Sequence, residues 1–318
     1  MLNTSGRWSA RICSGGECGL IWLDPQPVEA DIGKLYQSYY THDDSPKYAA
    51  TKSFIRQLKD FVNFGPLQGR NRSRMQLALL NVLAGAIQPL FPPLMSLLPP
   101  VAGALMDVGC GAGDLVEAAS LRGWRAIGVD FDPGAIAHAQ SKGLDTRLGS
   151  LQAQALRDAS FDAVVMSHSI EHFIDPIAVA REARRILKPG GRLIIATPNT
   201  SSYCHRRFAA NWAHLDPPRH LHLFNASNLE KMLGKAGFDG KIESTSVLGA
   251  PFVFTASQMI QREGKFEVAG QEPLEVQVRA AIMILAEFVA MKKSVETGEE
   301  LRVVAVRSGE SGGDSAKR

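Results

Sequence analysis

The feature that most constrains the fold is an apolar strand that ends in a glycine-rich turn and leads directly into a helix. Residues 104–108 (Ala-Leu-Met-Asp-Val) form the apolar run, and Gly109, Gly111 and Gly113 follow it. The next residues have helical spacing up to Leu121, and Gly123 ends that helix. In open α/β sheets, ligands lie at the carboxyl end of such a strand, where glycines let the backbone come close. The segment therefore predicts an α/β fold with a ligand at this turn.

Three aspartates indicate which ligand the turn binds. A dinucleotide fingerprint, Gly-x-Gly-x-x-Gly, needs glycine where this chain has Asp114. Asp107 ends the first strand, where its charge would repel a pyrophosphate and attract an ammonium group. Asp130 ends a second apolar strand and is placed to accept hydrogen bonds from a ribose, which NAD and S-adenosylmethionine both contain. S-adenosylmethionine, with an amino-acid end and no phosphate, fits this pattern better than NAD.

Strands and helices alternate through the middle of the chain. Further apolar strands are expected at 125–130, 161–167 and 192–197, and Asp132-Pro133 and Asp175-Pro176 each predict a helix start. This alternation predicts a Rossmann-like, mostly parallel sheet with helices on both faces. The later elements expected are a helix capped by Ser227 that ends at Lys235, a strand at 241–248, a helix at 274–293 and a strand at 301–306.

The chain divides into four predicted parts. Residues 1–44 are expected to be irregular, 45–100 to form a helical cap, 101–307 to form the α/β domain with an insertion at 198–225, and 308–318 to be a disordered tail. Cys13 and Cys18 lack the second ligand pair of a zinc ribbon, so two free thiols are expected.

The composition limits which binding partners and which cellular compartment are expected for this chain. The 318 residues carry a net charge of only +3 without a long basic run, which argues against nucleic acid. Four cysteines and no apolar leader favour the cytoplasm. Residues 75–106 contain no charged residue or histidine, but prolines interrupt them, so a peripheral membrane contact is expected there rather than a spanning helix.

The successive motifs resemble those of class I S-adenosylmethionine-dependent methyltransferases. The motifs are Asp107-Val-Gly-Cys-Gly-Ala-Gly113, Gly-Val-Asp130, Phe161-Asp-Ala-Val-Val and Leu187-Lys-Pro-Gly-Gly-Arg-Leu193. The resemblance covers roughly residues 103–240. It implies a seven-stranded sheet whose last strand is antiparallel.

The same resemblance implies the cofactor contacts. It places the methionine end at Asp107, Gly109 and Gly111, the ribose at Asp130, and the adenine near Phe131 and residues 149–151. The full set of predicted S-adenosylmethionine contacts is Asp107, Gly109, Cys110, Gly111, Gly113, Asp130, Phe131, Gly149, Ser150, Leu151 and Ser167.

A narrower resemblance connects residues 168–172 and 212–221 to a bacterial subgroup associated with glycan or natural-product modification. Members often carry Cys-x-x-Cys-Gly near the N-terminus, and the altered form here disfavours a zinc role for the two N-terminal cysteines.

Methyl transfer needs a positioned acceptor and, where a proton leaves, a base. The predicted catalytic residues are His168, Glu171, His172 and His220. Helical spacing would place His168 and His172 on one face with Glu171 beside them. Three roles stay open for these three residues: a metal site, a base or substrate contact, or structural hydrogen bonds. No metal is assigned.

The insertion supplies the predicted acceptor contacts, because its prolines stiffen a loop over the cofactor site. These contacts are Asn199, Trp212, Arg219 and His222, and Arg219 would favour an acidic group. The chain is therefore expected to methylate an oxygen of a small molecule, a glycan or a lipid-linked acceptor. The alternatives are an NAD-dependent dehydrogenase and a membrane-associated, non-catalytic binding protein; the oligomeric state is not predicted.

Overall fold

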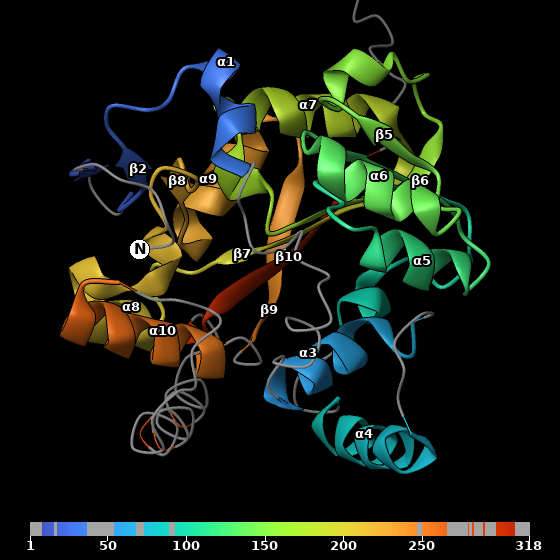
Figure 1. The fold of residues 1–318 in the computed structure, drawn as a ribbon. Helices are drawn as coiled ribbons and strands as arrows, with labels where there is room; N and C mark the ends of the chain where they lie inside the picture. The colour runs from blue at the N-terminus through green and yellow to red at the C-terminus, as the bar shows by residue number, and fades with distance from the viewer. Residues whose placement is uncertain are drawn as a thin grey trace, which may run out of the picture.

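The computed structural model describes residues 8–15, 18–36, 54–67, 73–88, 93–246, 250–265, 279, 282, 289 and 297–308. Its main body is a seven-stranded sheet in the order β5-β4-β3-β6-β7-β10-β9 (Figure 1). The strands are β3 (Ala104–Val108), β4 (Arg125–Asp130), β5 (Thr146–Leu148), β6 (Phe161–Ser167), β7 (Leu187–Pro198), β9 (Asp239–Ser246) and β10 (Glu300–Val306). β3 to β7 pair in parallel, and β10 pairs antiparallel with both β7 and β9. The predicted Rossmann-like sheet with an antiparallel last strand is confirmed.

Helices cover both faces of this sheet because its central strands are apolar on both sides. Every residue of β3 is buried. α7 (Pro176–Ile186) and α9 (Ala226–Lys235) pack on one face through Val179, Ala183 and Leu229, among others. α5 (Asp114–Ser120) and α6 (Pro133–Ser141) contribute Leu115 and Ile136 to the core on the other face.

Most predicted helix starts are confirmed, and one is wrong. The Asp132 and Asp175 side chains accept hydrogen bonds from backbone amides in the first turns of α6 and α7, and proline follows each of them. α9 is capped by Asn225 instead of Ser227, because Asn225 and Asn228 accept hydrogen bonds from each other's backbone amides. α7 ends at Ile186, and β7 begins at Leu187, five residues earlier than the strand predicted at 192–197.

Two helices lie where the helical cap was predicted. α3 (Phe54–Phe64) and α4 (Arg74–Ile87) pack together through Phe61, Leu80 and Ala84, and a 3-10 turn, η3 (Leu94–Leu97), connects them to the sheet core. Figure 1 shows α4 on the outer side of α3. Within the described residues, none of the helices is long and apolar enough to cross a membrane.

The N-terminal segment is more ordered than predicted. β1 (Ala10–Ile12) and β2 (Ile21–Leu23) form a hairpin, and β2 also pairs with β8 (His222–Leu223) from the insertion. α1 (Glu29–Ile32) and η1 (Gly33–Tyr36) follow. The expectation of irregular structure is therefore wrong for this part, because pairing with a distant segment supplies the order that its own sequence does not show.

The insertion folds into short helices over the carboxyl ends of the strands. It contains α8 (Tyr203–Phe208), η6 (Ala209–Asn211) and η7 (Ala213–Leu215). α8 and η7 share an apolar core with α10 (Ala250–Glu263). Figure 1 shows α8 and α10 side by side. The predicted helix 274–293 lies outside the described residues except for three helical positions, and residues 309–318 also lie outside. The boundaries of the four predicted parts stay predictions.

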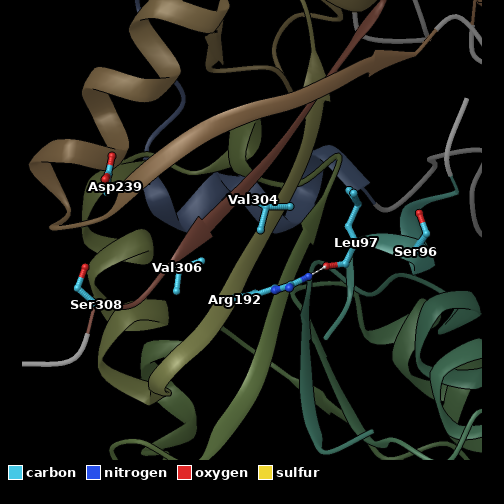
Figure 2. A pocket seen from close by; sticks show the side chains of 7 residues that line it. All are labelled: Ser96, Leu97, Arg192, Asp239, Val304, Val306 and Ser308. Atoms are coloured by element: carbon cyan, nitrogen blue, oxygen red, sulfur yellow. Dashed lines mark hydrogen bonds between the residues drawn. The ribbon is translucent and has the colours of Figure 1, made fainter. Parts of the chain in front are cut away.

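A pocket of about 510 Å³ opens at the opposite end of the sheet from the glycine turn. Its lining includes Arg192, Asp239 and Val306, and Arg192 donates a hydrogen bond to the Leu97 carbonyl at 2.9 Å (Figure 2). Arg192 lies where β7 pairs with the carboxyl end of β10. This pocket is therefore separate from the predicted cofactor site.

Candidate functional site

The glycine turn between β3 and α5 has a backbone that side chains would disturb. Gly109, Gly111 and Gly113 have φ angles of +79°, +50° and +81°, in the left-handed region that favours glycine. A Cβ at Gly109 would lie 2.5 Å from Ser169 Cβ, whereas a Cβ at Gly111 would meet no atom within 4 Å. Gly111 therefore faces open space, as a position beside a ligand must.

Asp107 is a buried carboxylate at the end of β3, with an exposed fraction of 3%. Desolvation raises its pKa to about 8, and the nearby charges of Asp130 and Asp114 act in the same direction. Because its surroundings disfavour the ionised form of Asp107, a cationic partner such as the ammonium end of S-adenosylmethionine would stabilise that form.

Asp130 joins the end of β4 to the glycine turn. Its carboxylate accepts hydrogen bonds from the Gly111 amide at 2.8 Å and from the Asp132 amide at 2.9 Å. Phe131, the next residue, is 43% exposed. The glycine turn, the Asp130 carboxylate and Phe131 therefore lie next to one another at the carboxyl ends of β3 and β4.

The other predicted cofactor contacts lie along the same edge. The Gly149 amide donates to the Asp130 carbonyl at 2.8 Å, so residues 149–151, which follow β5, lie beside the end of β4. The Ser150 hydroxyl accepts from the Ala153 amide, and Leu151 is buried. Cys110 is buried beneath the turn, where desolvation raises its thiol pKa, and Ser167 ends β6 beside the histidines described next.

A second group of side chains, which we call the histidine basin, lies between the segment that follows β6 and the insertion. It consists of His168, Glu171, His172, His214 and His220. The ring centroids of His168 and His214 are 6.3 Å apart, and those of His172 and His220 are 4.8 Å apart. Ser169 connects the basin to the glycine turn through its approach to Gly109.

His168 is a cation of this basin. It has a φ of +53° and lies before the 3-10 turn η5 (Ile170–His172) instead of within a helix. Its Nε2 donates a hydrogen bond to Glu300 Oε2 at 2.7 Å. Although desolvation lowers the pKa of His168, its interactions with Glu171 and Glu300 raise it to about 9. A protonated imidazole donates hydrogen bonds and does not act as a base.

The helical arrangement predicted for residues 168–172 is wrong. Because η5 is a 3-10 turn, His172 faces His220 from the insertion instead of aligning with His168. Glu171 is completely buried, and one of its oxygens accepts a hydrogen bond from the Thr197 hydroxyl at 3.0 Å.

Comparisons with known proteins are consistent with this geometry. The family model described as "Methyltransferase domain" matches residues 75–241, which is more than half of the chain. The chain belongs to this methyltransferase family. It is an S-adenosylmethionine-dependent methyltransferase, and the dehydrogenase and non-catalytic alternatives are not retained.

Two relatives and one solved structure illustrate the family. A probable S-adenosylmethionine-dependent methyltransferase of Mycolicibacterium smegmatis is 31% identical over 180 residues, which are 56% of this chain and 64% of that protein. The ubiquinone biosynthesis O-methyltransferase of Cereibacter sphaeroides is 32% identical over 189 residues, which are 55% of this chain and 74% of that protein. A phosphoethanolamine N-methyltransferase of Haemonchus contortus in complex with S-adenosyl-L-methionine shares the fold, with a TM-score of 0.50 and 18% identity over 91% of this chain and 62% of that one.

Most side chains that were predicted to contact the acceptor form hydrogen bonds or ion pairs with other residues of the protein. Asn199 is buried and donates to the Gly298 carbonyl, and Trp212 Nε1 donates to Glu299 Oε1 at 2.7 Å. Arg219 is buried and forms an ion pair with Asp216. Nδ1 of His222, in β8, forms a hydrogen bond with the Phe173 carbonyl. These bonds favour a structural role for the four side chains, and their contact with an acceptor stays a prediction.

Sequence reasoning missed the two carboxylates that approach the basin from the start of β10. Glu299 and Glu300 are buried, and Glu300 pairs with His168 and with Arg302. Desolvation raises the pKa of Glu300, but Arg302, His168 and Lys59 hold it well below its ordinary value. The available signal was an acidic pair directly before the last strand, which the topology brings to the carboxyl end of β7.

Proposed function

We propose that this methyltransferase transfers the methyl group of S-adenosylmethionine to an oxygen atom of a small molecule, a glycan or a lipid-linked acceptor. The observation that carries the proposal is the position of the histidine basin beside the glycine turn, under the insertion. The similarity to ubiquinone biosynthesis O-methyltransferases also supports oxygen as the acceptor atom.

The basin offers the groups that such a transfer uses. The sulfonium methyl is already activated, so the protein has to align the acceptor and accommodate its proton. Desolvation lowers the pKa of His220 to about 4 and that of His214 well below its ordinary value, so both imidazoles are neutral. The neutral imidazole of His214 can accept a hydrogen bond from an acceptor hydroxyl, while the protonated imidazole of His168 can donate one to an acceptor oxygen.

Transfer of labelled methyl groups tests this proposal. Purified protein would be incubated with methyl-labelled S-adenosylmethionine and matched pairs of hydroxyl-bearing and amine-bearing acceptors, including phenols, sugars and polyprenyl-linked sugars. We expect products with an alkali-stable methyl ether, identified by mass spectrometry. Label found only on amines or carbon atoms would contradict the choice of oxygen.

We also propose that the cap rests on a membrane surface from the cytoplasmic side, close to a lipid-linked acceptor. The side chains of Met75, Leu79 and Val82 in α4 are 80%, 48% and 71% exposed, and they have the i, i+4, i+7 spacing of one helix face.

Flotation with anionic vesicles tests this contact. Changing all three residues to serine should abolish flotation, whereas a Val101→Ser control, which removes a side chain that is 77% exposed outside α4, should not. Equal flotation of both variants would contradict the proposal.

A further inference from the structure

Three side chains of the histidine basin are arranged like the ligands of a metal ion. Glu171 and His172 come from η5 and His220 from the insertion, and one ligand atom of each lies within 4.8 Å of the other two. The sequence alone does not show this set, because His168, not His220, is at helical spacing from His172.

Both imidazoles are held in a way that is typical of metal-binding histidines. His172 Nδ1 donates to the Arg219 carbonyl at 3.0 Å, and His220 Nδ1 donates to the His214 carbonyl. A ring N–H bound to a backbone carbonyl fixes the tautomer with the lone pair on Nε2 and orients the ring, which is how proteins hold metal ligands.

Glu171 supplies a second, independent observation. Its side chain has an exposed fraction of 0%, and its Oε1 is buried without a hydrogen-bond partner in the described part of the chain. The Nδ1 atom of His168 is 3.7 Å from this oxygen, which is beyond hydrogen-bond distance. A buried carboxylate oxygen that accepts no hydrogen bond in the described part of the chain is available to coordinate a metal ion.

We propose that Glu171, His172 and His220 bind one divalent transition-metal ion of the zinc type. Two imidazole nitrogens and one carboxylate oxygen form the ligand set of open zinc sites, whereas Mg²⁺ prefers oxygen ligands. Three protein ligands leave a coordination position for a water molecule or for an oxygen of a bound molecule. The competing explanation is that His168 alone balances the charge of Glu171.

Titration with Co²⁺ tests the proposal, because a Co²⁺ ion in a site of low coordination number absorbs visible light. The experiment uses the untagged full chain after treatment with a chelator. We expect one Co²⁺ per chain with a visible absorption that Zn²⁺ removes and Mg²⁺ does not. Glu171→Gln and His220→Gln should each weaken binding at least about tenfold.

His222→Gln is the matched control. This histidine also directs Nδ1 to a backbone carbonyl but belongs to β8 and stacks on Phe224. The control should bind Co²⁺ like the unmodified protein. No visible absorption in the unmodified protein, or equal affinity in all variants, would overturn the proposal.

A second measurement keeps the test decisive if a variant does not fold. Binding of S-adenosylhomocysteine reports folding, since none of the three ligands is among the predicted cofactor contacts. X-ray absorption of the zinc-loaded, unmodified protein should then show only nitrogen and oxygen ligands, including imidazole. Sulfur in the coordination shell would overturn the assignment, because it would place the ion at Cys13 and Cys18 instead.

Discussion

The Nε2 atom of His168 lies 2.7 Å from Oε2 of Glu300, although 132 residues separate the two in the sequence. The pair joins the carboxyl end of β6 to the start of β10 across β7. It therefore positions the histidine basin relative to the last strand of the sheet.

Glu300→Gln should lower the free energy of unfolding by about 3 kcal/mol, because it removes the buried counter-charge that His168 and Arg302 share. Urea denaturation measures the change. The control is Asp158→Asn, which removes an ion pair to Arg185 whose carboxylate is 75% exposed and should cost less than about 1 kcal/mol. Equal losses in the two variants would show that the Glu300 pair does not stabilise the basin.

Asp107 should make the stability of the cofactor-free protein depend on pH. Its pKa is about 8 in the folded protein against an ordinary 3.8. Between these values the folded state keeps a proton that the unfolded chain has lost. The free energy of unfolding should therefore fall as the pH rises from about 4 to about 8.

Asp107→Asn removes this ionisation, so its urea midpoint should fall less between pH 5 and pH 8 than that of the unmodified protein. The same substitution should weaken S-adenosylhomocysteine binding, because the ammonium group loses its counter-charge. Identical pH profiles for the two proteins would contradict the burial of an ionisable carboxyl at this position.

Gly111→Ala should weaken S-adenosylhomocysteine binding more than about tenfold, or about 1.4 kcal/mol. The added Cβ meets no protein atom within 4 Å, so it enters the space expected for the cofactor. Gly190→Ala is the matched control, because it also has a positive φ and no atom near the added Cβ but lies at the start of β7. Calorimetry should show unchanged affinity for the control, and an equal loss in both would trace the effect to backbone strain.

Trp212→Phe should cost about 1–3 kcal/mol of stability, because it leaves Glu299 without its indole donor in a buried setting. Affinity for S-adenosylhomocysteine should stay the same, since Trp212 belongs to the core of the insertion. A large loss of cofactor affinity with unchanged thermal stability would show instead that this side chain contacts the ligand.

The sheet and the glycine turn could be predicted because their signals are local. A glycine turn after an apolar strand, an acid at the end of the next strand and two Asp-Pro helix starts each lie within a few residues of sequence. The cap of α9 was misplaced because serine and asparagine both favour that position, and the reciprocal bonds between Asn225 and Asn228 are visible only in the structure.

The histidine basin and the three-stranded sheet of β1, β2 and β8 could not be predicted, because long-range contacts create them. Glu300 reaches His168 only through the register of β10 against β7, and β2 is only three residues long and gains its order by pairing with β8. Helical spacing suggested the wrong histidine as the neighbour of His172, because residues 170–172 form a 3-10 turn that faces the insertion.

A structure of the protein with S-adenosylhomocysteine tests the central claim most directly. The account predicts the amino-acid end at Asp107 and Gly111, the ribose at Asp130, and the sulfur directed toward the histidine basin. A complex with the cofactor in the pocket around Arg192, or with its sulfur directed away from the basin, would contradict it.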